Sequence, residues 1–167
     1  MTVWLSGKRA RLIGDAPAIA AALAAHGAEL VEGAEADIVV HVASPPAVRP
    51  AHELSHSEWH ATLDAGLDQR FHEAKALADA CRARGTGGAV IFIGAPEQAL
   101  GADHAAAAGA LGNLTKTLGV EWARDGVRVN SVLTRSTGET LGNLVAYLAS
   151  DYAAYVTGAV MGVDCSD

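Results

Sequence analysis

A histidine followed by a run of alanines is the part of this sequence whose residue types first suggest chemistry. His104 opens the segment HAAAAGALGNLTKTLGVEWARDGVRVNSV, which ends at Val132. An imidazole titrates near neutral pH, so His104 could act as a general acid or base. No aspartate, glutamate or cysteine nearby in the sequence suggests a triad around it. We expect a surface or partner contact at this position, and an enzyme that uses His104 remains an open alternative.

Three other histidines recur every four residues and could share one face of a helix. They are His52, His56 and His60, and Asp64 continues the same spacing. A metal site needs about three or four converging ligands. Because His52 falls before the expected start of the helix, we expect a solvated polar face here and no bound metal.

The elements that would position these residues alternate between strands and helices. Five short apolar runs, bounded by glycine or charge, are typical of buried parallel strands. These runs are 10–13, 37–43, 88–94, 127–133 and 158–164. The alternation predicts a Rossmann-like, doubly wound α/β fold with a parallel sheet, formed by residues 1–167 as a single domain.

Helical patterns fill the gaps between these strands. They cover 17–26, about 57–84, about 103–124 and about 138–149. Asp15 is expected to cap the first of these helices, because an aspartate side chain accepts hydrogen bonds from the first turn. Ser55 and Glu58 are spaced as a capping box ahead of the second helix.

The composition excludes several classes of protein. Half of the 167 residues are hydrophobic, so the chain can bury a substantial core. A net charge of −7 would repel nucleic acid and an anionic membrane surface, and we expect neither as a partner. No apolar run is long enough for a membrane span or a signal peptide, so we expect a cytoplasmic protein. Cys81 and Cys165 form no CxxC pair, and we expect two reduced thiols.

Four blocks of sequence after Ser57 follow a characteristic order and spacing. They are SEWHATLDAGLDQRF, GTGGAVIFIGA, LTKTLGVEWARDGVRVNSV and LVAYLASDYAAYVTGAVMGVD. In these blocks the chain resembles the short-chain dehydrogenase/reductase family, and the first 45 residues match that family more weakly. The resemblance implies a Rossmann-like fold and, in active members, a nicotinamide cofactor.

The positions that carry catalysis in the family are all replaced in this chain. The resemblance implies a tyrosine as acid or base, a lysine four residues later, a serine that orients the substrate and an asparagine on the preceding helix. Those positions hold, in the same order, His104, Ala108, Ala95 and Gly66. An acid or base without its electrostatic partner leaves hydride transfer without a proton path.

The features that hold the cofactor in the family are reduced as well. The family places the pyrophosphate on a GxxxGxG turn, whereas this turn has Gly14 alone, followed by the acidic Asp15. EGAEA (32–36) stands where relatives have a strand and a helix around the adenosine, and HVAS (41–44) replaces NNAG. We therefore expect no cofactor in this chain and a sheet truncated at its adenosine-binding edge, abbreviated or re-paired.

The substrate lid of the family is also missing from the sequence. Relatives follow VNSV with Pro-Gly and a long lid, but here LTRSTGETLGNL runs almost directly into the next helix. A closing lid excludes water from the reaction. The deletions thus affect the cofactor edge and the lid, while the strands and the two long helices remain.

The two long helices would still offer a surface to another subunit. In the family, helices such as 57–84 and 103–124 pack against their counterparts across an interface. The small residues of AAAAGA (105–110) allow close approach, and a stripe of apolar side chains supplies buried area. The candidate interface residues are Leu63, Leu67, Phe71, Leu111, Leu114, Leu118 and Trp122. This stripe could instead face the chain's own sheet, at least in part.

We therefore arrive at a hypothesis of division of labour between subunits. The chain is expected to be a non-catalytic (pseudoenzyme) subunit that stabilises an active paralogous dehydrogenase/reductase subunit in a heterotetramer of two plus two chains. NAD or NADP, and the alcohol or ketone substrate, are expected in that partner. The alternative is a homo-oligomeric ligand-binding or scaffolding module that uses the vacated cleft without chemistry.

Overall fold

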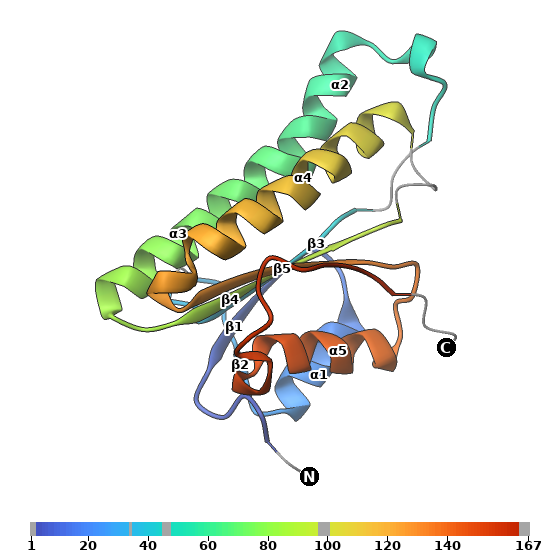
Figure 1. The fold of residues 1–167 in the computed structure, drawn as a ribbon. Coiled ribbons are helices and arrows are strands. Elements are labelled where there is room, and N and C mark those ends of the chain that lie inside the picture. The colour runs from blue at the N-terminus through green and yellow to red at the C-terminus, as the bar shows by residue number, and fades with distance from the viewer. Residues whose placement is uncertain (1–2, 34, 45–47, 97–100, 164–167) are drawn as a thin grey trace.

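A parallel sheet lies at the centre of the structure, a computed structural model that describes residues 3–33, 35–44, 48–96 and 101–163 (Figure 1). The strand order is β2-β1-β3-β4-β5-β6, and every neighbouring pair is parallel. The strands are β1 (Arg9–Ile13), β2 (Glu29–Leu30), β3 (Ile38–Val42), β4 (Gly88–Gly94), β5 (Val127–Leu133) and β6 (Val160–Gly162). The predicted Rossmann-like α/β fold is confirmed.

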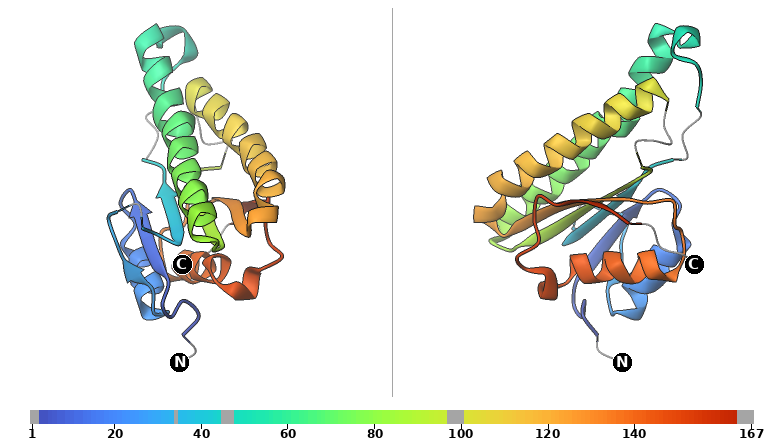
Figure 2. Two further views of the ribbon diagram at one scale, coloured as in Figure 1. Left: turned by 90° about the vertical axis from the view of Figure 1, so that its left-hand side faces the viewer. Right: turned by 45° about the vertical axis from the view of Figure 1, so that its right-hand side comes forward.

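Helices cover both faces of this sheet. They are α1 (Pro17–Ala25), α2 (His56–Leu63), α3 (Gln69–Arg84), α4 (Ala102–Glu121) and α5 (Glu139–Ala149). Helices α3 and α4 lie on one face, and α1 and α5 lie on the other (Figures 1 and 2). The helix expected over 57–84 is divided into α2 and α3 by a π-helical turn at Asp64–Asp68. In the described part of the chain, no helix combines the length and apolarity needed to span a membrane.

The core has two layers, one on each side of the sheet. The layer under α1 and α5 includes Ile19, Leu23, Val145 and Leu148 together with inward-facing strand residues. The layer under α3 and α4 includes Phe92 and Leu77. Because helices cover both faces, the central strands are apolar along nearly their whole length.

Three of the residues expected at a subunit interface lie in the chain's own core. Leu111, Leu118 and Trp122 are at most 6% exposed and pack in the layer under α3 and α4. The face of α4 that carries them turns toward the sheet, so these three side chains are not available to a partner. This part of the expected interface is corrected. The other candidates are only partly buried and stay a prediction; they are Leu63, Leu67, Phe71 and Leu114.

The two expected helix caps have different outcomes. The capping box is confirmed, because the Glu58 amide donates to Ser55 Oγ at 3.2 Å and the Ser55 amide donates to Glu58 Oε2 at 2.9 Å. The cap by Asp15 was wrong, because the N-cap of α1 is Ala16, which makes no side-chain hydrogen bond. Pro17 occupies the first turn, and a proline disfavours helical geometry in the residue before it, so the helix begins after Ala16.

The sheet is short at the edge where the sequence predicted a truncation. Strand β2 has two residues, which pair with Arg9 and Ala10 at the start of β1. Because the chain leaves β2 so early, it needs little length to return to the start of β3, and its described residues form no helix there. At the other end of the fold, residues 134–138 alone join β5 to α5, as expected for a chain without a lid.

Candidate functional site

A cleft lies at the carboxyl ends of the central strands. It contains three adjoining cavities, of about 60, 310 and 560 Å³, which all include Ala43 and Ser44 just after β3. Doubly wound α/β folds bind their ligands outside the carboxyl ends of the strands. This cleft is therefore the candidate functional site.

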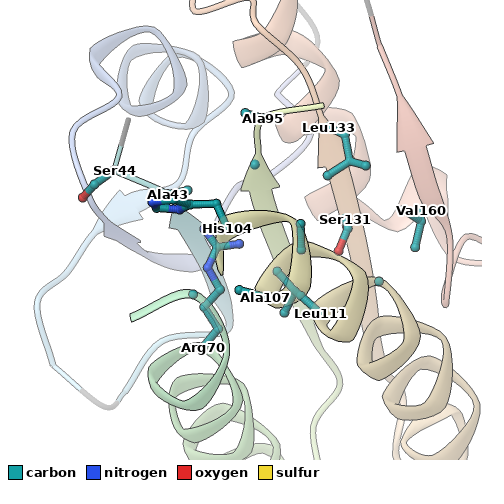
Figure 3. A pocket seen from close by; sticks show the side chains of 14 residues that line it. Ala43, Ser44, Arg70, Ala95, His104, Ala107, Leu111, Ser131, Leu133 and Val160 are labelled. Carbon is teal, nitrogen blue, oxygen red and sulfur yellow. The ribbon is translucent and has the colours of Figure 1, made fainter. Parts of the chain in front are cut away.

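The four replaced positions meet around the smallest cavity. Gly66, Ala95, His104 and Ala108 all line it, although they come from the π-helical turn, the end of β4 and the start of α4 (Figure 3). Counting along the sequence thus identified positions that are close in space. Three of the four present a hydrogen atom or a methyl group, so His104 alone among them has a titratable side chain.

The packing of two helices explains why position 66 is a glycine. A Cβ atom on Gly66 would lie 2.9 Å from the Cβ of Ala107 on α4. A contact this short requires one of the helices to move. No side chain can therefore project from position 66 into the cleft while α4 keeps its place.

His104 has an acidic neighbour, which the sequence argument discounted. Its Nε2 lies 3.9 Å from Oδ2 of Asp103, a carboxylate that is 4% exposed. Burial raises the pKa of Asp103, but the hydrogen bond donated by Thr62 at 2.8 Å and the nearby His104 outweigh it, so the pKa is lowered overall. The statement that no acidic residue accompanies His104 is thus corrected. At 3.9 Å the pair is an electrostatic contact, too long for a hydrogen bond.

Arg70 on α3 is a charged residue of the cleft that the sequence argument missed. Its side chain reaches up toward His104 and Ala43 (Figure 3) and is 2% exposed. Nη2 donates to the Ile93 carbonyl at 3.0 Å, and the guanidinium carbon lies 5.9 Å from the ring centroid of Phe92. Burial lowers the pKa of Arg70 to about 10, so the group keeps its charge at neutral pH.

The charge of Arg70 has no counter-ion in the described part of the chain. No described carboxylate lies within 4.0 Å of its guanidinium, and its Nε atom has no hydrogen-bond partner. A signal for this residue existed in the sequence. Arg70 falls on the same helical stripe as Ala74, Leu77 and Cys81, which are all buried, so helical periodicity would have placed it inside.

His41 is a second buried polar residue that faces the same cleft. It lies within the apolar strand β3, is 8% exposed and lines the 310 Å³ cavity with Arg70. Burial, with the positive charges of Arg70 and Arg11, lowers the pKa of His41 to about 4. The imidazole is therefore neutral at physiological pH, and its Nδ1 atom has no hydrogen-bond partner.

The other candidate groups in the sequence are separate from the cleft. The rings of His56 and His60 lie 4.3 Å apart, and both residues are exposed. Over the described residues, no cluster of three or more histidine, cysteine or acidic side chains is arranged for a metal ion. Cys81 is a buried free thiol whose pKa is raised by burial, and Cys165 lies outside the described residues.

A comparison with models of known protein families assigns most of the chain to one family. Residues 12–146 match the family model described as short chain dehydrogenase, which covers well over half of the chain. The chain belongs to the short-chain dehydrogenase family. The resemblance found in the sequence is confirmed.

Several curated short-chain dehydrogenases are similar to this chain. The galactitol 2-dehydrogenase of Cereibacter sphaeroides is 29% identical over 93% of this chain and 74% of its own length. A tropinone reductase homolog of Arabidopsis thaliana is 27% identical, with coverage of 77% and 59%. Subunit BbsC of the (2S)-[(R)-hydroxy(phenyl)methyl]succinyl-CoA dehydrogenase of Thauera aromatica is 31% identical, with coverage of 76% and 61%. The chain thus spans less than two thirds of the length of the last two relatives.

Solved structures show the same fold. A short-chain type dehydrogenase/reductase from Mycobacterium marinum superimposes with a TM-score of 0.85 at 22% identity, covering 96% of this chain and 94% of that one. A gluconate 5-dehydrogenase from Burkholderia cenocepacia J2315, solved with NADP and tartrate, gives a TM-score of 0.84 at 22% identity with the same coverage. At this identity the likeness concerns the fold alone.

The turn after β1 differs from the phosphate-binding turn of the family in a way the structure explains. Gly14 has a φ of +96°, and a Cβ there would lie 2.7 Å from the Val42 carbonyl oxygen, so contact with β3 itself requires this glycine. Asp15 and Pro17 line the 560 Å³ cavity beside it. Asp15 brings a carboxylate to the start of α1, and Pro17 has no backbone N–H to donate to a phosphate.

Proposed function

We propose that this short-chain dehydrogenase is a non-catalytic subunit that stabilises an active paralogous subunit, which holds NAD or NADP and converts an alcohol or a ketone. One observation carries the proposal. The four positions of the reaction centre converge on a cavity of about 60 Å³, and three of them are Gly66, Ala95 and Ala108. We infer that the positions of a reaction centre are present here without the functional groups that the family's reaction requires.

The chemistry of hydride transfer supports this proposal. The reaction needs a positioned acid or base whose pKa is tuned by a neighbouring cation, and it needs the cofactor beside it. Ala108 offers no cation to His104, and the ion-pair contact of His104 among the described residues is with a carboxylate, that of Asp103. The cation that lines the same cavity, Arg70, donates its hydrogen bond to the Ile93 carbonyl.

The geometry around the expected cofactor position also supports it. A dinucleotide would set its pyrophosphate against the carboxylate of Asp15, and its nucleoside would meet a sheet edge whose last strand has two residues. These residues do not fit a nicotinamide dinucleotide. We propose that the cofactor of the complex lies entirely in the partner.

A surface for such a partner remains on the long helices. Helices α2–α3 and α4 run side by side and extend past the sheet (Figures 1 and 2). Leu63, Leu67, Phe71 and Leu114 are partly buried, and Val120 on α4 is 77% exposed. A relative that is 31% identical, BbsC of Thauera aromatica, is named as a subunit of a dehydrogenase. That name agrees with an assembly of more than one subunit.

The test is purification of the chain from its own host at low salt, followed by native mass spectrometry and activity measurements with NAD and NADP. We expect a full-length dehydrogenase of the same family in equal stoichiometry, with the cofactor mass on that subunit alone. Recovery of the chain only with itself would exclude the proposal. If the isolated chain shows turnover and the His104→Ala variant does not, the protein is an enzyme that uses His104, and the proposal of a non-catalytic subunit is wrong.

The homo-oligomeric binding module remains as a second candidate because of one observation. Arg70 is buried beside a cavity of about 310 Å³ without a described counter-ion. A homo-oligomer that retains a small ligand through purification, in the absence of a dehydrogenase partner, would favour this candidate.

A further inference from the structure

The unsatisfied buried polar atoms of the described residues lie close to one cavity. Three buried side-chain atoms of the described residues have no hydrogen-bond partner: His41 Nδ1, Arg70 Nε and Asp103 Oδ1. His41 and Arg70 line the 310 Å³ cavity, and Asp103 contacts two other lining residues, Thr62 and His104. Buried polar groups normally find partners, so such a concentration indicates a site that a ligand completes.

We propose that this cavity binds a small organic carboxylate, whose anionic group is held by the guanidinium of Arg70. Burial of an arginine that has no counter-ion among the described residues is unfavourable, and a carboxylate in the cavity would offset that cost. Arginine presents its N–H groups in a planar fork that matches a carboxylate. The side chain points toward His104 and the end of β3, where the cleft lies (Figure 3).

The neighbours of Arg70 agree with an anion as the ligand. The neutral imidazole of His41 adds a polar group to the lining without adding charge. Gln69 is engaged elsewhere, because its amide donates to Asp64 at 2.9 Å. Asp103 does not itself line the cavity, and its Oδ2 accepts the hydrogen bond of Thr62.

The charge and the walls of the cavity favour a carboxylate over a phosphate. Arg70 is the lining residue with a permanent positive charge, and one such charge balances one carboxylate. A phosphate dianion would keep an uncompensated charge in a buried place. Ala43, Ala61, Ala65 and Gly66 form an apolar part of the wall that suits a short aliphatic tail.

This proposal goes beyond the role of the chain as a subunit and can fail independently of it. The probe is sodium butyrate, added to the protein as purified, with any co-purifying subunit, at an ionic strength held constant with sodium chloride. Melting temperature and isothermal titration give the affinity, and the arginine Nε–H resonances of ¹⁵N-labelled protein report on Arg70 directly. We expect a saturable rise in melting temperature and a shift of the Arg70 resonance.

Two variants separate a binding role of Arg70 from a structural role. Arg70→Met removes the charge but keeps an unbranched apolar side chain, and we expect it to weaken butyrate binding at least about ten-fold. Arg11→Met is the matched control, because Arg11 is a partly buried arginine that is already paired with Glu73 at 2.6 Å. It should bind butyrate like the wild type. If Arg70→Met does not fold, Arg70→Lys and the wild-type resonance provide the same comparison.

Several results would overturn the proposal. Equal effects of butyrate and chloride, or butyrate binding that persists in Arg70→Met, would show that the cavity holds no carboxylate on Arg70. Stabilisation by inorganic phosphate in place of butyrate would assign the site to a different anion. Loss of binding in Arg70→Met with retention in Arg11→Met supports the proposal, whichever subunits co-purify.

Discussion

The buried Arg70 and the partly buried Arg128 show how differently the two ends of the sheet are built. Arg128 lies at the amino end of β5, and its guanidinium donates to four carbonyl oxygens at and after the end of α5. Arg70 lies near the carboxyl end of β4 and donates to one carbonyl, that of Ile93. The charge of Arg128 is compensated by the partial negative charge of a helix C-terminus. The guanidinium of Arg70 still has N–H groups that could bind a ligand.

The surroundings of the two arginines repeat this contrast. At the amino ends of the strands, Asp37 pairs with Arg9 and with Arg84, and Glu35 also pairs with Arg9, so the charges there neutralise one another. At the carboxyl ends, His41 and Arg70 both have an atom without a partner. The amino ends therefore stabilise the fold, and the carboxyl ends retain the unsatisfied groups typical of a binding site.

The largest effect is expected for Arg128→Met. The substitution leaves four partly buried carbonyl groups without their donor, so we expect the free energy of unfolding to fall by about 3 kcal/mol. Urea denaturation followed by circular dichroism measures it, with Arg124→Met, an exposed position, as the control.

Arg70→Met should change stability by less than about 1 kcal/mol, because it also removes a buried charge. Equal losses in Arg70→Met and Arg128→Met would remove the contrast between the two ends.

The next effect concerns the pH dependence of stability through His41. The folded chain protonates this imidazole at about pH 4, and the unfolded chain does so near 6.5, because burial and the charges of Arg70 and Arg11 lower the folded pKa. Between these values the unfolded state binds more protons. The stability that neutral His41 contributes is complete above pH 6.5 and decreases toward pH 4, by about 3 kcal/mol in total.

Denaturation midpoints measured from pH 4 to 7.5 test this dependence. His41→Gln should flatten the pH profile, and His56→Gln, at an exposed position, should leave it as in the wild type. A profile that His41→Gln does not alter would assign the pH dependence to other groups.

A smaller loss is expected when the family's asparagine is restored by Gly66→Asn. The new Cβ would meet Ala107 at 2.9 Å, so we expect a loss of about 2 kcal/mol from the displacement of a helix. Gly109→Ala on α4 is the matched control, because nothing lies within 4 Å of its Cβ position. It should stabilise the protein by about 0.5–1 kcal/mol. Stability of Gly66→Asn equal to the wild type would show that position 66 is not closed by α4.

The smallest effect is expected at the uncapped helix beside the cleft. Ala16→Ser should add a side-chain cap to α1 and stabilise the protein by about 0.5–1 kcal/mol. Ser55→Ala removes the existing cap of α2 and should cost about 1 kcal/mol. The two changes in melting temperature should have opposite signs; a loss on Ala16→Ser would mean that the cleft-side turn excludes a larger side chain.

Local sequence determined the strands, the helices and the residue numbers of the four positions that carry catalysis in the family. Apolar runs and capping signals depend on neighbouring residues, so they predicted the parallel sheet and the cap at Ser55. The spacing between His104 and the blocks after it is also local, because both lie on one helix. This is why Gly66, Ala95, His104 and Ala108 could be identified and then found together.

Only the tertiary structure decided which side chains face one another. The burial of Leu111 and Trp122 depends on how α4 is rotated against the sheet, which an apolar stripe does not specify. Arg70 and His41 are 29 residues apart, and the environment that holds one charged and the other neutral arises when α3 packs on β3 and β4. Burial and counter-ions are properties of the assembled neighbours, and no local pattern contains them.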